Sequence, residues 1–343
     1  DQDLAQVEDE VGRLALATAG AYNARHRLGL DAEGRAGADL FTIAAPFAAA
    51  SRDNTGTGAI TASVADAGAL SASGYRVDFD GTNYAVTRLS DQVTRTFGSL
   101  PQTVDGIAFG MGGTPAAGDS FTVNAVREVA ASMTAAISRP QALALALPVA
   151  PTAAAANGGT LKVTGFAVPG PAADPNLTQG VSIRFTSATT FDVTGTGTGN
   201  PTGLAYTPGQ PIAFNGWTIT MEGTPVAGDT MAIGASTAWN GDNRNGLAMG
   251  AIAGAGLVDG MSLNEALAGL FGKVGTLASS VAATAEAQEA VRADALGAET
   301  SLAGVNLDEE AARLMQYQQA YQAAAKVIAT AQTIFDTLLD LGR

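Results

Sequence analysis

Apolar side chains recur at alternating steps of three and four residues at the start of the chain. Over residues 1–28 these positions are Leu4, Val7, Val11, Leu14, Thr18 and Ala21. This spacing places them on one narrow stripe of an α-helix, as in a coiled coil. Gly29 and Gly34 follow and end the pattern. The sequence therefore predicts a helix over residues 1–28, and because no capping residue precedes it, we expect this helix to continue an upstream one.

The C-terminal part of the chain, residues 257–343, predicts two further helices. The first begins at a capping box formed by Ser262 and Glu265, and Gly297 and the region to Gly304 are expected to interrupt it. Its apolar stripe runs through Leu263, Leu267, Leu270, Val274, Leu277, Val281, Thr284, Gln288 and Val291. The second helix begins with Asn306 as its N-cap. Acidic residues in its first turn complement the positive end of the helix dipole: Asp308, Glu309 and Glu310.

The last helix carries the longest apolar stripe. Its positions are Leu314, Tyr317, Tyr321, Ala324, Ile328, Ala331, Phe335 and Leu338. At about 1.5 Å per residue this helix is roughly 50 Å long, and a single helix cannot bury its own stripe. Tyr317 and Tyr321 could stack on a cofactor, but their helical spacing favours packing. We therefore predict that these positions form an assembly interface with other helices, either upstream in the same protein or in another subunit.

The middle of the chain, residues 51–238, is dominated by Gly, Thr, Ser, Ala and Pro. Short alternating runs such as residues 75–79 and 182–185 are typical of half-buried strands, and Asn-Gly and Asp-Gly pairs mark tight turns. Residues 105–123 align without gaps on residues 215–233 and share a Gly-Thr-Pro-x-Ala-Gly-Asp block. The sequence therefore predicts two antiparallel β modules related by duplication.

Together these elements predict an α+β multidomain fold. An α-helical, coiled-coil-like region comes from both chain ends, and two antiparallel β-rich modules are inserted into it. The predicted parts are an N-terminal helix and loop (1–50), module 1 (51–139), a linker (140–157), module 2 (158–238), a helical region (239–303) and a C-terminal helix (304–343). The linker is expected because its Ala and Pro content leaves few anchors for packing.

Composition excludes several classes of function. The 343-residue chain has no Cys and one His, which excludes thiolate zinc sites, Cys nucleophiles and multi-histidine metal sites. Its net charge of −14 disfavours nucleic acid as a partner, because phosphate binding needs a basic surface. The chain contains no uninterrupted run of about 18 apolar residues, so no membrane span is predicted. Its acidic start does not resemble a cleavable signal peptide. We therefore expect a mature fragment of a larger protein, without nucleic-acid or membrane partners.

Three groups of polar residues could carry chemistry, and each has a simpler structural interpretation. His26 lacks the neighbouring nucleophile and acid that a catalytic base needs. Two clusters offer oxygen ligands: Asp31, Glu33 and Asp39 in one, and Asp242, Asn243 and Asn245 in the other. Both lack calcium-loop spacing and favour turn chemistry. The Gly-Thr-Pro blocks lack the Lys of a phosphate-binding loop and favour hairpin loops. We therefore predict no catalytic, cofactor-binding or metal site.

Several motifs resemble one protein family. The Gln-x-x-Tyr-x-Ala pattern beginning at Gln318 is similar to the C-termini of bacterial flagellar axial proteins in general. Residues 304–312 (GVNLDEEAA), 335–339 (FDTLL), 241–245 and 22–34 resemble, more narrowly, the hook-associated protein 1 family of hook–filament junction proteins. The GTPAAGDSFTV stretch of the β zone is also similar to that family.

The resemblance implies a structural protein and not an enzyme. Members pack both helical termini near the axis of a tubular assembly, with β-rich domains outward, and are exported to the extracellular flagellum without signal cleavage. The implied partners are further copies in a ring, the hook protein, the second junction protein and N-terminal helices upstream of this chain. Two alternatives stay open: another flagellar axial protein, or a β-rich adhesion or carbohydrate-binding module on a helical stalk, which the Thr/Gly-rich repeats would fit.

Overall fold

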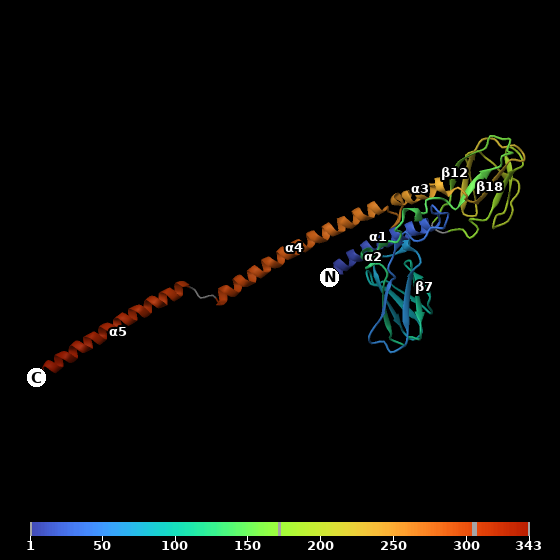
Figure 1. The fold of residues 1–343 in the computed structure, drawn as a ribbon. Coiled ribbons are helices and arrows are strands. Elements are labelled where there is room, and N and C mark those ends of the chain that lie inside the picture. Colours follow the sequence, from blue (N-terminus) through green and yellow to red (C-terminus); the bar gives the residue numbers. More distant parts are fainter. Residues whose placement is uncertain (1, 171–172, 304–306, 342–343) are drawn as a thin grey trace. The chain divides into compact units, whose positions relative to one another are not determined.

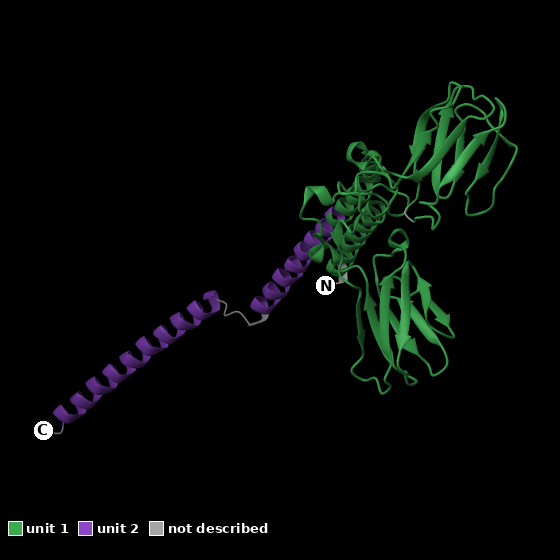
Figure 2. Ribbon diagram, turned by 45° about the vertical axis from the view of Figure 1, so that its right-hand side comes forward, with its two compact units in different colours: residues 1–274 green, residues 275–343 purple. Residues whose placement is uncertain are grey.

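The computed structural model describes residues 2–170, 173–303 and 307–341 (Figure 1). The chain divides into a first unit, residues 1–274, and a second unit, residues 275–343 (Figure 2). The first unit contains both β modules and the helices α1 (Gln2–Arg27), α2 (Val129–Ser132) and α3 (Arg244–Ala251). Helix α4 (Leu263–Ala303) begins in the first unit and ends in the second, which also contains α5 (Leu307–Leu341). Helices at both ends and a β-rich middle confirm the predicted α+β class.

Helix α1 forms where the three-four apolar spacing predicted it. Arg25 and Arg27 lie in its last turn, where positive charge complements the carbonyl end of the helix dipole. Leu14, Leu16 and Ala17 are buried, because α1 has packing partners on more than one side. The helix is therefore stabilised by tertiary contacts in addition to its own hydrogen bonds.

Helix α4 begins at the predicted capping box. The Glu265 carboxylate accepts a hydrogen bond from the Ser262 amide at 2.9 Å, and the Glu265 amide donates to the Ser262 hydroxyl at 3.4 Å. The predicted interruption from Gly297 begins too early, because α4 continues through Gly297 to Ala303, and Gly304 lies outside the described residues. One glycine costs a helix only about 1 kcal/mol, which the Ala-rich neighbours offset. The predicted N-cap Asn306 lies outside the described residues.

Module 1 consists of two antiparallel sheets. The five-stranded sheet has the order β2 (Phe47–Ala50), β9 (Ser120–Asn124), β4 (Gly74–Phe79), β5 (Tyr84–Arg88) and β6 (Thr94–Phe97). The three-stranded sheet has the order β3 (Ala59–Val64), β8 (Ile107–Gly112) and β7 (Gln102–Val104). Alternate side chains point into one core, whose largest members are Tyr75, Phe109 and Phe121.

Module 2 repeats this plan strand for strand. Its five-stranded sheet has the order β11 (Val149–Ala153), β18 (Thr230–Ala235), β13 (Val181–Phe185), β14 (Thr190–Thr194) and β15 (Leu204–Ala205). Its three-stranded sheet has the order β12 (Lys162–Ala167), β17 (Trp217–Glu222) and β16 (Pro211–Phe214). Trp217, Phe185 and Met221 are fully buried in its core. The identical order of all eight strands supports the duplication inferred from the sequence.

The same hairpin turn joins two strands in each module. Asp105 and Gly106 link β7 to β8, and Asn215 and Gly216 link β16 to β17. All four residues have positive φ, between 43° and 76°, as a two-residue type I′ turn requires. The Asp-Gly and Asn-Gly pairs therefore determine the register of these hairpins locally.

The predicted module boundaries need correction. Residues 149–153, assigned to the linker, form strand β11, which pairs with β18 at the edge of module 2. Strand β2 likewise lies just before the predicted start of module 1 and pairs with β9. Both strands contain Ala-rich runs that lack strong alternation, and backbone pairing with a distant strand decides their structure.

The remaining short elements lie between the modules and the helices. Strand β1 (Phe41–Thr42) pairs with β10 (Thr134–Ala135). The single-turn 3₁₀ helices are η1 (Ala67–Ala69), η2 (Pro140–Ala142), η3 (Trp239–Gly241) and η4 (Ile252–Gly254).

Candidate assembly helices

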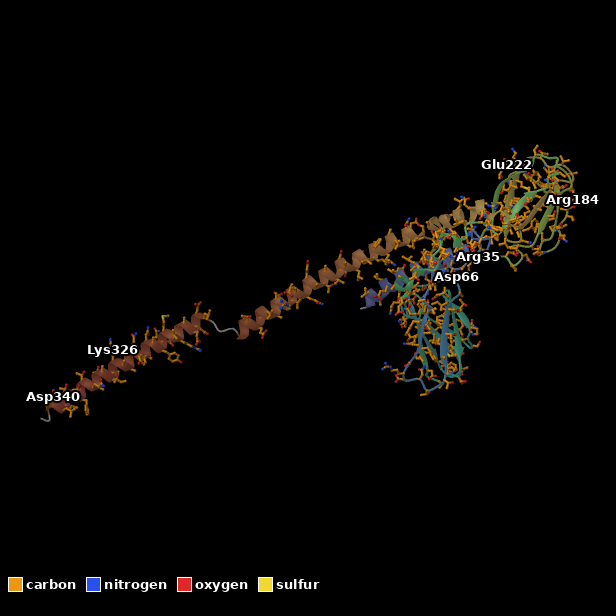
Figure 3. The ribbon with its side chains drawn as sticks, viewed as in Figure 1. Arg35, Asp66, Arg184, Glu222, Lys326 and Asp340 are labelled. Carbon is orange, nitrogen blue, oxygen red and sulfur yellow. The ribbon has the colours of Figure 1, made fainter. Side chains whose placement is uncertain are left out.

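The apolar stripe predicted on α5 is accessible along its whole length. Tyr321 exposes 77% of its surface and Phe335 62%, and no described residue of α5 is buried. Figure 3 shows the side chains along this helix, with Lys326 and Asp340 labelled. All the predicted interface positions are exposed: Leu314, Tyr317, Tyr321, Ala324, Ile328, Ala331, Phe335 and Leu338. The structure therefore leaves this surface available to a partner.

Helix α5 is more apolar towards its C-terminal end. At about 100° per residue, Val327 and Ile334 lie on the flank of the predicted stripe, seven residues apart, and Leu341 continues the spacing. All three side chains are exposed. The stripe predicted from the sequence does not include them, and the seven-residue repeat is the signal that identifies them. The second half of α5 therefore presents a wider apolar arc than the first half.

The apolar stripe of α4 is buried beside a neighbouring helix and exposed elsewhere. Leu270 packs with Leu14 and Ala17 of α1 and is only 6% exposed. Further along the same stripe, Val281 is 57% exposed and Val291 is 69% exposed. The residue type and the spacing change little along α4. The contact with α1 therefore accounts for the burial of its first turns.

Helix α4 also has the length and hydropathy of a membrane-spanning helix. Between Leu263 and Ser301 its mean hydropathy reaches 1.3, with 11% of that window buried. The sequence-based expectation considered only uninterrupted apolar runs, whereas α4 mixes Ala, Gly, Leu and Val with few charges. Length and composition do not separate a membrane span from a helix covered by other proteins. The first turns of α4 pack against α1.

Arg13 of α1 joins three parts of the first unit. Its guanidinium donates to Glu10 at 2.6 Å, to Asp259 at 2.8 Å and to the Leu70 carbonyl at 3.3 Å. Asp259 lies in the loop before α4, and Leu70 lies in module 1. Hydrogen bonds between ionised groups are stronger than those between neutral groups. Arg13 therefore fastens α1 to both neighbours.

His26 is completely buried at the end of α1. The Ala144 amide donates to its Nε2 at 2.8 Å, so the proton of the neutral ring lies on Nδ1, which donates to the Ala38 carbonyl at 2.6 Å. Both ring nitrogens are thus occupied by the backbone. This arrangement gives His26 a structural role at the end of α1.

The two candidate metal clusters form turns and ion pairs. Asp31 accepts hydrogen bonds from the Glu33 and Arg35 amides at 2.8 and 2.9 Å, and the Arg35 amide is the main reason that the pKa of Asp31 is lowered. Asp242 accepts from the Leu147 amide at 3.0 Å and pairs with Arg244 at 2.8 Å. These oxygens bind the protein's own donors, as the turn interpretation expects.

Each Gly-Thr-Pro block forms a loop, between β8 and β9 in module 1 and between β17 and β18 in module 2. The predicted hairpin is wrong, because the two strands that each loop joins belong to different sheets of the module. The aspartate that ends each block closes its own loop. Asp119 accepts hydrogen bonds from the amides of Thr55, Gly56 and Ala116. Asp229 accepts them from the amides of Gly158, Gly159 and Val226. The loop amides are thus bound internally, where a phosphate cradle would keep them free.

A second shared motif, missed in the sequence, completes these loops. Asn54 exchanges two hydrogen bonds with the Ser120 backbone, and Asn157 does the same with Thr230. Two residues further on, Gly56 and Gly159 leave no space for a Cβ beside the loop aspartate. The shared pattern Asn-x-Gly-Thr, at 54–57 and 157–160, is the signal that reveals this part of the repeat.

Acid is expected to weaken both modules. Backbone hydrogen bonds, first those of Ala116 and Val226, hold the pKa of Asp119 and Asp229 below the ordinary value of 3.8. A lowered folded-state pKa gives stability that is complete above 3.8 and is lost as pH falls through the folded value. Hydrogen exchange of β9 and β18 should therefore accelerate below about pH 4. Asp119→Asn should make β9 exchange faster at pH 7 and flatten its acid dependence, whereas the exposed control Asp53→Asn should change neither.

Comparisons with known proteins agree with the architecture. A family model described as the D2-like domain of flagellar hook-associated protein 1 matches residues 49–125, within module 1. A second, described as the C-terminal of the flagellar basal body rod FlgEFG protein, matches residues 300–341. Flagellar hook-associated protein 1 of Escherichia coli (strain K12) is 28% identical over 345 residues, 99% of this chain. The chain is similar to flagellar hook-associated protein 1 along 99% of its own length. The resemblance found in the sequence is confirmed.

Further similarities support the same relationship. Flagellar hook-associated protein 1 of Salmonella typhimurium is 28% identical over 347 residues, again 99% of this chain. The solved structure of the flagellar hook junction protein FlgK from Burkholderia pseudomallei superposes with a TM-score of 0.75 and 26% identity, covering 87% of this chain and 60% of that one. The chain spans about half the length of the curated relatives it matches, 47% and 48%.

Proposed function

We propose that the chain is part of a structural component of the bacterial flagellum, at the junction between hook and filament. Its relatives bear the name of hook-associated protein 1, and its structural neighbour is a hook junction protein. The mechanism is mechanical: helical stripes pack against neighbouring helices in a coiled-coil-like axial region, and the β modules form the outer part. The location is the extracellular flagellum, reached by flagellar export without signal cleavage.

One observation carries this proposal. The stripe of α4 is buried where α1 lies beside it and exposed beyond that contact. The stripe of α5 has the same spacing and no cover among the described residues. Each large apolar side chain gains about 1.5–3 kcal/mol on burial, so a covering helix would be held strongly. The proposed partners are helices that precede this chain, other copies in a ring, the hook protein and the second junction protein.

Hydrogen exchange of α5 tests the proposal. In the isolated chain the amides of residues 307–341 should exchange rapidly, because a helix without tertiary contacts is only marginally stable. In assembled junctions containing the same residues they should be protected at least a hundredfold more, while the amides of β18 should be protected equally in both samples. A monomeric isolated chain with α5 fully protected would contradict the missing-partner argument.

The alternatives predict other results. The match of residues 300–341 to a rod-protein model fits any flagellar axial protein, whereas the whole-chain match is to hook-associated protein 1. An adhesion module would lose binding when the loops at 110–120 or 220–230 are changed, and a glycan array with the chain would reveal this loss. Specific glycan binding that these changes abolish would favour the adhesion alternative.

A further inference from the structure

Module 1 is joined to α1 through a shared core. Leu16 of α1 is buried among the module 1 side chains, and Ala15 packs against them. Asp9 accepts hydrogen bonds from the Asn124 amide group at 3.1 Å and from Arg127 at 3.0 Å. Gly12 approaches module 1 so closely that a Cβ would lie 1.7 Å from the Val126 carbonyl oxygen. Movement of module 1 against α1 would therefore break a packed core.

Module 2 is joined to the helices by far less. Its core is built from residues between Leu147 and Ile233, and no α1 side chain belongs to it within the described part of the chain. Two arginines reach it from the helices: Arg25 of α1 donates to the Val168 carbonyl at 2.5 Å, and the Arg244 guanidinium of α3 lies 5.3 Å from the Phe166 ring centre. Neither contact inserts apolar surface into the core of module 2.

The hydrogen bond from Arg25 to module 2 contributes little stability. The Arg25 side chain is buried, yet no carboxylate of the described residues pairs with it, and its Nε has no hydrogen-bond partner there. Burial lowers the pKa of Arg25, because desolvation disfavours the charged guanidinium. A buried guanidinium without a counter-charge pays a desolvation penalty that one carbonyl compensates only in part.

The duplication shows that module 2 lacks the docking residues of module 1. The strand pair Tyr75–Val123 in module 1 corresponds to the pair Val181–Ile233 in module 2. The pair Gly74–Asn124 corresponds to the adjacent positions, residues 180 and 234. In this register Gly234 stands where module 1 has Asn124, and Thr237 stands where it has Arg127. The two side chains that hold Asp9 of α1 therefore have no counterparts.

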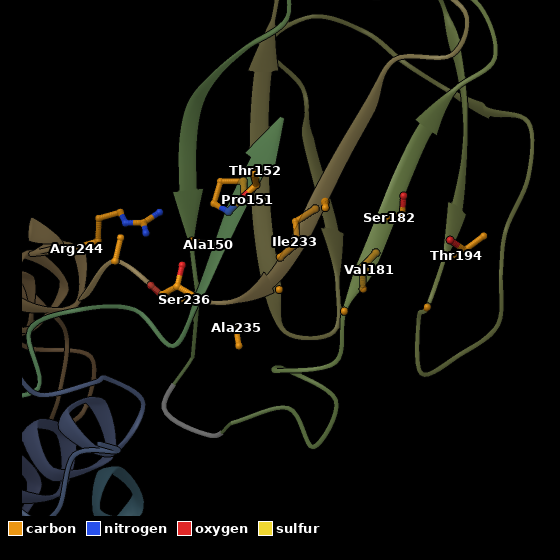
Figure 4. Close-up of a pocket in the computed structure, with 16 residues that line it drawn as sticks. Ala150, Pro151, Thr152, Val181, Ser182, Thr194, Ile233, Ala235, Ser236 and Arg244 are labelled. Carbon is orange, nitrogen blue, oxygen red and sulfur yellow. The ribbon is translucent and has the colours of Figure 1, made fainter. Parts of the chain in front are cut away.

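Open space lies where those contacts are lost. An open groove of about 600 Å³ lies at this edge of module 2, and Ala150, Gly180, Ser236 and Arg244 are among its lining residues (Figure 4). The corresponding groove of module 1 has Ala5, Gln6 and Asp9 of α1 as one wall. Module 2 thus has room to move at the edge where module 1 is docked.

We propose that module 2 pivots as one body about its two chain crossings, near residues 147–149 and 236–239, with Arg25 and Arg244 as releasable latches, while module 1 moves rigidly with α1. The core of module 2 stays closed during this motion, because it is complete without the helices. Such a module can adapt to different neighbours while the helical base keeps its geometry. The proposal concerns the chain itself and does not depend on the hook–filament function.

Distances between pairs of spin labels test the pivot. The chain has no native Cys, so introduced cysteines are the only labelling sites. One pair joins Arg27→Cys on the exposed end of α1 to Thr82→Cys in the β4–β5 hairpin of module 1. The other joins Arg27→Cys to Ala188→Cys in the β13–β14 hairpin of module 2. We expect the second distance distribution to be at least twice as wide as the first, and equal widths would overturn the pivot.

Latch variants test the role of the two arginines. Arg25→Ala combined with Arg244→Ala should further widen the distance distribution of the spin-label pair that reports on module 2. The distribution of the pair that reports on module 1 should stay unchanged. The matched control is Arg184→Ala, which removes an exposed arginine on strand β13 of module 2. This change should widen neither distance distribution. Unchanged hydrogen exchange of β18 shows that module 2 stays folded in each variant. If the double variant leaves the width unchanged, or if Arg184→Ala has the same effect, the latch assignment is wrong.

Discussion

Replacing Leu314 and Ile328 together by Asp should abolish filament attachment while both β modules remain folded. Each position loses at least about 1.5 kcal/mol of burial in the assembled state, so the two lower the affinity at least a hundredfold. The charge placed against a neighbouring helix adds a desolvation cost. The measurement is motility and electron microscopy of bacteria whose protein carries the two changes.

The matched control puts the same charges on the other face of α5. Gln319 and Thr333 lie on the polar side of the helix, and Gln319→Asp with Thr333→Asp adds the same number of carboxylates without touching the stripe. This variant should retain motility. Normal motility of the Leu314→Asp, Ile328→Asp variant would refute the assembly role of the stripe.

A single methyl group at Gly12 is expected to loosen module 1 from α1. The added Cβ would lie 1.7 Å from the Val126 carbonyl oxygen, so the helix and module 1 must move apart. Overpacking of this kind costs about 1–3 kcal/mol. Hydrogen exchange of β9 and thermal unfolding should both show the loss.

Gly269 of α4 provides the opposite case. A Cβ there meets no atom within 4 Å, so Gly269→Ala adds the same methyl group to a helix without a clash. It should stabilise by about 0.5–1 kcal/mol through the lower entropy of the unfolded chain. If Gly12→Ala were as harmless as Gly269→Ala, the close docking of α1 on module 1 would be refuted.

The helices and the hairpin turns could be predicted because their signals are local. The capping box at Ser262 and the type I′ turn at Asn215 depend on residues within a few positions of each other. The repeat of the Gly-Thr-Pro blocks, which end at Asp119 and Asp229, likewise indicated two modules, and the identical strand orders agree.

The edge strands and the exact boundaries could not be predicted in this way. Strands β2 and β11 contain Ala-rich runs with weak alternation, and they are strands because β9 and β18 lie beside them. The continuation of α4 through Gly297 also went against its local signal, since a single glycine penalty is small beside the hydrogen bonds of a long helix.

The sequence by itself determined the helical stripes, the turns, the duplication and the relationship to flagellar axial proteins, because each rests on residue types at short, regular spacing. Only the tertiary structure decided that Leu270 is buried while Val281 is exposed, and that Leu16 joins the core of module 1 while module 2 closes its core without α1. The physical reason is that burial depends on which distant segment occupies the adjacent space, and a stripe of fixed spacing does not specify that segment.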